Sequence, residues 1–446
     1  MTAEILPILM GVALLLGIFS GYPVAFVLGG VGVLFLFIGG VPVFTLQLAV
    51  SRTIGIMSNW LLLAIPLFVF MGIMLDRSGV AKNLLYSLER LLGGTRGGLA
   101  VAVAVLGIVL AASTGIVGAS VVMLGVLALP VMLKEGYSPS LATGVVAASG
   151  TLGILIPPSI MLVVLGSMLQ VSVGDLFKAA FVPGLLLGFL YILYVLIFAR
   201  LSPASAPPVK RENVTVGWSA VAEVLKDLAG PLILIVVVLG SIIAGVATPT
   251  EAAALGALGA TVLALLARQL SWKALKEVVY ETALINAMIL FVLIGATVFS
   301  GVFKQVGGED LIRDAVTGTG LGPFGVLMMF MVVLFILGCF LEWIEITFVV
   351  LPLFTPIILE LDFGMGLSET EKLIWFAIAV AVNLQTSFMT PPFGFSLFYV
   401  KGVAPPEVPI TTVYRGAIPF VVLQLVGLAL VILLPVLTVG VVRALN

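Results

Sequence analysis

Two short stretches of the chain combine residue types that suit binding of a small cation. The first is GTLGILIPPSI (150–160), and the second is TSFMTPPFG (386–394). In each stretch, adjacent prolines lack the N–H groups that continue a helix, so upstream carbonyl groups lose their donors. Glycines allow unusual backbone dihedral angles, and Ser and Thr hydroxyls supply further oxygen atoms. Hard, neutral oxygen atoms of this kind predict Na⁺ sites.

The candidate positions divide between the two stretches. The first comprises Ser149, Gly150, Thr151, Gly153, Pro157, Pro158 and Ser159, and the second comprises Thr386, Ser387, Thr390, Pro391, Pro392 and Gly394. A single proline pair fits a kinked helix whose hydroxyls bond to the preceding turn. Two pairs at matching positions favour a binding role instead. We assign Ser149, Ser159 and Ser387 to the solute rather than to the ion.

Two further segments carry polar groups inside apolar runs. ASTGIVGAS (112–120) suits either a hairpin tip beside the first break or close packing between helices. Glu342 and Glu345 are three residues apart, on one face of a predicted helix. Carboxyl groups inside membrane segments are costly and commonly functional. We expect at least one of them to bind solute, a cation or a proton; the alternative is that they anchor a tip by hydrogen bonds.

The composition indicates which elements position these residues. Of the 446 residues, 62% are hydrophobic and 9% are charged, whereas soluble domains carry about 25% charged residues. A helical membrane protein with many crossings is therefore expected. The chain has one cysteine, no histidine and a net charge of −1. These counts exclude an internal disulfide, histidine-ligated metals, Ser-His-Asp triads and a basic nucleic-acid binder.

Several apolar runs are too short for the roughly 20 residues of a helical crossing, and they occur in pairs. Each pair predicts either a re-entrant hairpin or a broken crossing. Basic clusters at 77–96, 200–211 and 268–276 are placed in the cytoplasm by the positive-inside rule. An even number of membrane crossings must then separate these clusters. In the first half, two assignments satisfy this condition, with the hairpin at either 98–133 or 139–170. The remaining charges favour the hairpin at 98–133.

The two halves of the chain are predicted to be repeats, because Pro157-Pro158 is matched by Pro391-Pro392 and Pro23 by Pro249. The same count of membrane crossings gives the two halves opposite orientations. Inverted repeats with broken helices are typical of secondary transporters. The expected fold is an all-α polytopic membrane protein. Its predicted parts are scaffold helices 1–97; transport elements 98–200 (hairpin 98–134, broken helix 139–170, helix 174–200); a cytoplasmic linker 201–227; scaffold helices 228–304; and transport elements 305–446 (hairpin 322–361, broken helix 372–402, helix 408–440).

Three other features have structural interpretations. Thr248-Pro249-Thr250-Glu251 predicts a helix start in which Glu251 is a capping residue and not a site residue. Segments 43–57 and 269–280 are amphipathic and are expected to lie along the membrane surface as braces.

Four longer motifs resemble the large permease subunit of TRAP (tripartite ATP-independent periplasmic) transporters. They are TPTEAAALGALGA (248–260), ATGVVAASGTLGILIPPSI (142–160), LQTSFMTPPFGFSLFYVKGVAP (384–405) and YRGAIPFVVLQLVGL (414–428). The resemblance covers essentially the whole chain. It implies an elevator mechanism in the bacterial inner membrane, in which Na⁺ flux drives uptake of an organic acid. It also implies two partners, a small four-helix membrane subunit and a periplasmic solute-binding protein.

The resemblance implies two sodium sites and no prosthetic group. One site comprises Ser113, Thr114, Gly115, Gly150, Thr151, Gly153 and Pro157, and the other comprises Thr386, Thr390, Pro391 and Gly394. The first tip, STGIVGAS, is less serine-rich than in sialic-acid and dicarboxylate members and is more similar to a branch linked to 2-oxo, aromatic or other organic acids. No arginine lies in either break, so an anionic group is expected to rest on helix N-termini and hydroxyls.

Other functions are less consistent with these residues. A standalone Na⁺-coupled anion symporter of related fold is the close alternative, and it would need no binding protein. A primary pump is disfavoured, because the sequence has no GxxxxGK[ST] motif. An enzyme is disfavoured as well, because the hydroxyl groups have no histidine base. A purely structural membrane subunit would not respond to Na⁺.

Overall fold

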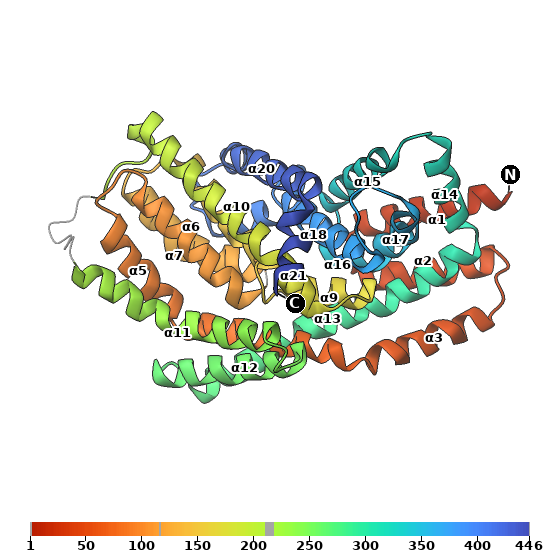
Figure 1. The fold of residues 1–446 in the computed structure, drawn as a ribbon, viewed down its shortest axis with the longest axis horizontal. Coiled ribbons are helices and arrows are strands. Elements are labelled where there is room, and N and C mark those ends of the chain that lie inside the picture. The colour runs from red at the N-terminus through yellow and green to blue at the C-terminus, as the bar shows by residue number, and fades with distance from the viewer. Residues whose placement is uncertain (1, 116, 210–217, 446) are drawn as a thin grey trace.

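A computed structural model describes residues 2–115, 117–209 and 218–445, apart from the side chains of residues 2–4, 113 and 114. These residues form helices and connecting loops, with no strand among them. The helices pack into an elongated bundle, with the N-terminus at one end and the C-terminus near the middle (Figure 1). Eight helices in the described part are long and apolar enough to cross a membrane. The predicted all-α polytopic membrane fold is confirmed.

The first half of the chain ends in one long helix. Its elements are α1 (Thr2–Phe19), α2 (Val24–Ile38), α3 (Phe44–Met57), a 3₁₀ turn (Trp60–Leu63), α4 (Ala64–Arg77), α5 (Val80–Leu92), α6 (Gly98–Thr114), α7 (Val117–Lys134), α8 (Pro139–Thr151), a 3₁₀ turn (Leu152–Ile154), α9 (Ile160–Leu169) and α10 (Val173–Leu201).

The second half begins at α11 and ends in a short terminal helix. Its elements are α11 (Trp218–Ile243), α12 (Pro249–Leu266), α13 (Trp272–Gln305), α14 (Gly308–Gly318), α15 (Pro323–Gly338), α16 (Trp343–Glu345), a π-helical segment (Ile346–Val350), α17 (Leu351–Glu360), α18 (Glu369–Ser387), α19 (Phe395–Val403), α20 (Ile410–Leu433) and α21 (Val439–Leu445). In both halves, a proline pair separates two consecutive helices, α8 from α9 and α18 from α19.

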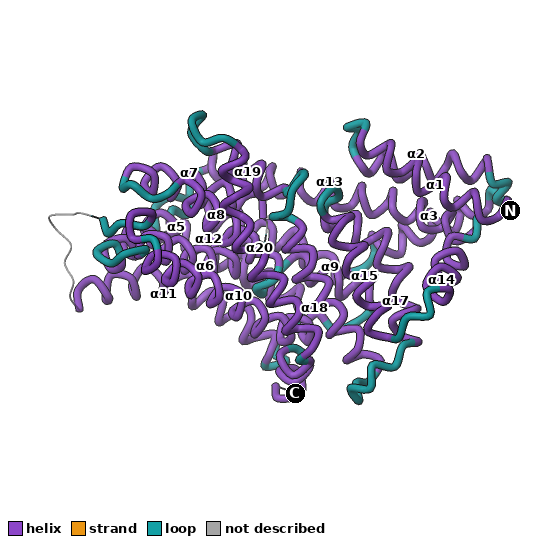
Figure 2. The backbone as a smooth tube through the Cα atoms, turned by 90° about the horizontal axis from the view of Figure 1, so that it is seen from above, coloured by secondary structure: helices purple, strands orange, loops and turns teal. Residues whose placement is uncertain are grey.

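Helices α8 and α18 form the centre of the molecule. Every residue of 141–151 and of 374–387 is buried. Helix α8 packs against α6, α7 and α20, and α18 packs against α15, α10 and α20, as Figure 2 shows from above. Because these two stretches are enclosed on all sides, neither shows the single polar face of an amphipathic helix.

Outside this centre, α2 packs along α13, α12 along α4, and α11 along α5 and α12. Small residues allow the close approach. A Cβ atom at Gly32 would lie 3.1 Å from the Phe299 backbone. Two exposed ion pairs join Arg77 of α4 to Glu277 and Glu281 of α13, at 2.8 and 2.7 Å.

Three local features bear on the sequence predictions. Thr248 and Glu251 form a reciprocal capping box at the start of α12, so the capping role of Glu251 is confirmed. The amphipathic segment 269–280 is not a separate element, because a helix capped by Ser271 runs without interruption into the 34-residue α13; its placement along the membrane surface stays a prediction. The helix expected over 408–440 ends at Leu433, because Pro435 cannot continue it.

Candidate ion and solute site

The first break lies between α8 and α9 and is entirely buried. The chain leaves α8 at Thr151, makes a 3₁₀ turn, and contains a cis peptide bond between Pro157 and Pro158. Ser159 caps α9 by accepting a hydrogen bond from the Leu162 N–H, and its hydroxyl donates to the Ile154 carbonyl. The serine hydroxyl therefore closes the loop across the proline pair.

The second break lies between α18 and α19 and is closed in the same way. Pro391 and Pro392 are also joined by a cis peptide bond, and Gly394 begins α19 with φ +50°. The hydroxyl and the N–H of Ser396 donate to the Phe388 carbonyl, at 2.8 and 3.2 Å. Sequence reasoning missed Ser396. Its position just beyond a proline pair, as with Ser159, is the signal that could have identified it.

The tip between α6 and α7 contacts the first break. Gly115 ends α6 with φ +62°, and a Cβ atom there would lie 3.4 Å from the Ile160 nitrogen, which begins α9. Glycine therefore allows the tip to approach the start of α9. Ser113 and Thr114, the other predicted sodium ligands of this tip, have side chains outside the described residues.

The remaining predicted residues of the first break contact different helices and do not converge on one site. A Cβ atom at Gly150 would lie 2.9 Å from Val121 Cα, so this glycine lets α7 approach α8. Ser149 packs against Gly107 of α6, and its hydroxyl has no partner among the described residues. Thr151 lies toward α18 instead. Gly153 and Pro157 are buried in the loop itself.

The predicted hydroxyls of the second break bond to their own helix. Thr386 donates to the Val382 carbonyl at 2.9 Å, Ser387 to Leu384 at 2.8 Å, and Thr390 to Thr386 at 2.9 Å. Such bonds use the hydroxyl hydrogen and leave oxygen lone pairs free to accept or to coordinate a cation. The arrangement is compatible with either interpretation of the hydroxyls, as helix-bonded groups or as ion ligands.

A buried polar cluster that the sequence analysis missed joins the two breaks. The Gln385 amide donates to the hydroxyl oxygens of Thr151 (3.4 Å) and Tyr191 (3.3 Å). Gln424 of α20 donates to the same Tyr191 oxygen at 2.7 Å. All four side chains are buried. The signal in the sequence is a glutamine inside each of two apolar motifs, 384–405 and 414–428.

Both tips, and the helix ends that flank the two breaks, border one cavity of about 240 Å³, which we call the tip cavity. Gly115 and Gly118 of the first tip, Glu342 and Trp343 of the second, and Ile160 at the start of α9 lie on its wall. Phe388 at the C-terminal end of α18, Phe395 and Tyr399 of α19, and one face of α13 complete it. The tip cavity is therefore the place where a solute could contact both halves of the chain.

The two predicted carboxyl groups lie at the second tip. Glu342, half-buried, is the residue before α16, and its side chain borders both the tip cavity and a larger apolar cavity of about 670 Å³. The larger cavity separates the second tip from α1, α2 and α13. Glu345 borders only the larger cavity; it is 5% exposed, and its Oε2 has no partner among the described residues.

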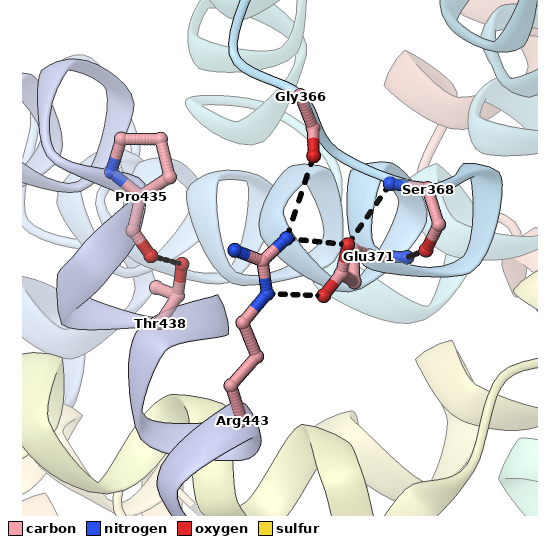
Figure 3. Close-up of polar contacts among 6 residues, drawn as sticks. All are labelled: Gly366, Ser368, Glu371, Pro435, Thr438 and Arg443. Atoms are coloured by element: carbon pink, nitrogen blue, oxygen red, sulfur yellow. Dashed lines mark hydrogen bonds and ion pairs between the residues drawn. The ribbon is translucent and has the colours of Figure 1, made fainter.

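A separate polar contact holds the C-terminal helix, away from the cavities (Figure 3). Arg443 of α21 binds both oxygens of Glu371 in the first turn of α18, at 2.6 and 2.9 Å, and also donates to the Gly366 carbonyl. The hydrogen bond from Arg443, helped by the Ser368 N–H, lowers the pKa of Glu371 to about 2. The contact ties the last helix of the chain to the start of α18.

Comparison with known proteins identifies the family. The family model described as "Tripartite ATP-independent periplasmic transporter, DctM component" matches residues 11–437. The C4-dicarboxylate TRAP transporter large permease protein DctM of Pseudomonas aeruginosa is 35% identical over 378 residues, covering 84% of this chain and 85% of the relative. The ectoine/5-hydroxyectoine TRAP transporter large permease protein UehC of Ruegeria pomeroyi is 32% identical, covering 83% of each chain.

A solved structure supports the fold. The Alcanivorax borkumensis YdaH transporter superposes with a TM-score of 0.62 at 17% identity, covering 89% of each chain. The matched relatives are permeases and not enzymes. The chain therefore belongs to the DctM family: it is the large permease subunit of a TRAP-type secondary transporter, a multi-pass protein of the bacterial inner membrane.

Proposed function

We propose that this subunit imports an organic acid in symport with Na⁺, by an elevator movement of the elements around the tip cavity. The observation that carries the proposal is the tip cavity itself, which both hairpin tips and the helix ends flanking both breaks border. A solute bound there would contact residues of both halves at once. Opening and closing the cavity would then require the two tips to move relative to the rest of the chain.

The proposed moving unit comprises residues 98–200 and 305–446, and the proposed fixed scaffold comprises 1–97 and 228–304. The packing is consistent with this division. Helices α8 and α18, from the two halves, share the neighbour α20, and the Gln385 cluster links them. The scaffold pairs α2 with α13 and α4 with α12. The larger apolar cavity lies along the boundary between the second tip and α1, α2 and α13, where few polar contacts would have to break during movement.

Na⁺ is proposed to bind at the two breaks. Each break holds carbonyl groups beside a cis proline pair and hydroxyl oxygens with free lone pairs. The proposed ligands are the backbone and side-chain oxygens of the predicted sodium residues, with Gly115 and Gly394 setting the turns. A Na⁺ ion at a break would also stabilise the closed arrangement of the tip beside it.

The solute is proposed to be a carboxylate delivered by a periplasmic binding protein, with a small membrane subunit beside the scaffold. The family description names a tripartite system, and relatives carry names that refer to C4-dicarboxylate and ectoine. Helices α7, α9 and α19 begin at the tip cavity. Their N-terminal N–H groups would favour the carboxylate of such a solute.

Reconstitution tests this proposal. The permease, its small subunit and the binding protein are assembled with liposomes, and the organic acid that most stabilises the binding protein serves as the labelled solute. We expect uptake only with an inward Na⁺ gradient and with the binding protein present. Uptake without the binding protein would support the standalone symporter. Equal uptake with K⁺ in place of Na⁺ would exclude Na⁺ coupling.

A further inference from the structure

The wall of the tip cavity carries an unusual combination of side chains. Among the described residues that line it, Glu342 is the only charged one, and none is a Lys or an Arg. Four aromatic residues also line the cavity: Trp343, Phe388, Phe395 and Tyr399. The Tyr399 ring lies on Gly118, where a Cβ atom would be 3.1 Å from ring carbon Cζ. The Phe388 and Phe395 rings meet edge to face.

This wall matches the chemistry of an organic cation. A carboxylate in an apolar enclosure is costly unless a positive group pairs with it, and the wall supplies no such group. Aromatic faces attract cations, and a cage of several rings with a carboxylate suits alkylated ammonium groups in particular. Na⁺ instead requires a shell of oxygen atoms, which the rings cannot provide. The missing positive charge is therefore expected to come from the solute.

The same cavity also has a place for an anion. Val117, Ile160 and Phe395 line it, and they begin α7, α9 and α19, which are 18, 10 and 9 residues long. The partial positive charge at these helix starts favours a carboxylate. The tip cavity thus offers a site for negative charge and a site for positive charge within about 240 Å³.

We propose that the solute is a small zwitterion. Its carboxylate would rest on the helix N-termini, and its alkylated or cyclic ammonium group would lie between Glu342 and the aromatic rings. This inference rests on the proposed transport function and specifies its substrate class. It predicts that the positive charge, rather than the shape, of the solute decides binding.

Isosteric pairs that differ only in N⁺ against C test the inference directly. We choose glycine betaine with 3,3-dimethylbutanoate, 4-(trimethylammonio)butanoate with 5,5-dimethylhexanoate, and 1,1-dimethylpiperidinium-4-carboxylate with 4,4-dimethylcyclohexanecarboxylate. The permease with its small subunit, in detergent and Na⁺, is titrated with each compound while the thermal midpoint is followed. We expect at least one zwitterion to bind at least about tenfold more tightly than its carbon isostere, the effect of one lost ion pair of roughly 1.4 kcal/mol.

Glu342→Gln should remove this preference, since the amide carries no charge. Glu360→Gln is the matched control, because Glu360 is an exposed carboxylate of α17 paired with Arg313; it should keep the preference. Stronger binding of the carbon isosteres, no response to any zwitterion, or an unchanged preference in Glu342→Gln would overturn the inference. The assay uses no ion gradient. A failure here is therefore distinguishable from a failure of Na⁺-driven uptake.

Discussion

The side-chain amide of Gln385 donates a hydrogen bond to the hydroxyl oxygen of Thr151, 3.4 Å away, although 234 residues separate them in the chain. Thr151 ends α8, and Gln385 lies two residues before the end of α18. A buried polar contact therefore joins the helix ends that precede the two breaks. This contact links elements from opposite halves of the chain directly.

Tyr191 holds the centre of this cluster, because its oxygen accepts from both Gln385 and Gln424. Tyr191→Phe would leave two buried amide groups without that acceptor, and we expect it to lower the free energy of unfolding by about 1–3 kcal/mol. The thermal midpoint in detergent measures the change. Tyr194→Phe is the control, since the Tyr194 ring packs on the same Phe420 ring as Tyr191 does. Equal losses in the two variants would contradict the role of the hydroxyl.

Gly394 is predicted to be essential for the second sodium site. Its φ of +50° disfavours any side chain, and a Cβ atom would lie 3.1 Å from the Thr390 carbonyl oxygen. The left-handed conformation costs an L-residue about 1–2 kcal/mol, so Gly394→Ala should weaken Na⁺ binding about tenfold or more. The Na⁺ dependence of the thermal midpoint reports this change.

Gly402→Ala is the matched control for that experiment. Gly402 lies in the same helix, α19, and a Cβ atom there would meet no other atom within 4 Å. It should leave the Na⁺ dependence unchanged. If both variants behave alike, the conformation of the second break does not determine the ion site.

The Glu371–Arg443 contact should make the anchoring of α21 sensitive to pH. The pKa of Glu371 is about 2 in the folded chain and ordinarily 4.5. The stabilisation is therefore complete above pH 4.5 and is lost as the pH falls toward 2. A spin label at Ala444→Cys, in a Cys339→Ser background, should become more mobile over that interval. In Glu371→Gln the label should be mobile at every pH, whereas Glu369→Gln, in the same first turn, should resemble the parent.

The positions of the breaks could be predicted from the sequence, because proline pairs and glycines act locally on the backbone. The capping role of Glu251 was predictable for the same reason: the bonds of Thr248 and Glu251 lie within one turn. The family motifs likewise pointed to the membrane fold that the structure shows. For the breaks and the cap, the deciding residues lie close together in the sequence.

Features that depend on distant partners could not be predicted. Gln385 and Gln424 are ordinary glutamines in sequence, and only the packing of α8, α10, α18 and α20 brings them to Tyr191. The residue types also do not determine whether the Thr386 and Thr390 hydroxyls bind an ion or bond to their own helix. The continuity of α13 was missed because an amphipathic start and an apolar continuation were assigned to separate elements.

The most direct test of the proposed elevator movement uses the contact between Phe19 of α1 and Phe340 of the second tip, whose ring centroids are 5.5 Å apart. Cysteines replace both residues in a Cys339→Ser background, and a short bis-methanethiosulfonate crosslinker joins them through two reducible disulfide bonds before Na⁺-driven uptake is measured. The proposal predicts that the crosslink abolishes uptake and that a reductant restores it. A crosslink between cysteines at Phe26 and Phe291, both in the scaffold and 6.1 Å apart between ring centroids, should leave uptake intact. Full uptake with the Phe19–Phe340 crosslink in place would contradict a sliding second tip.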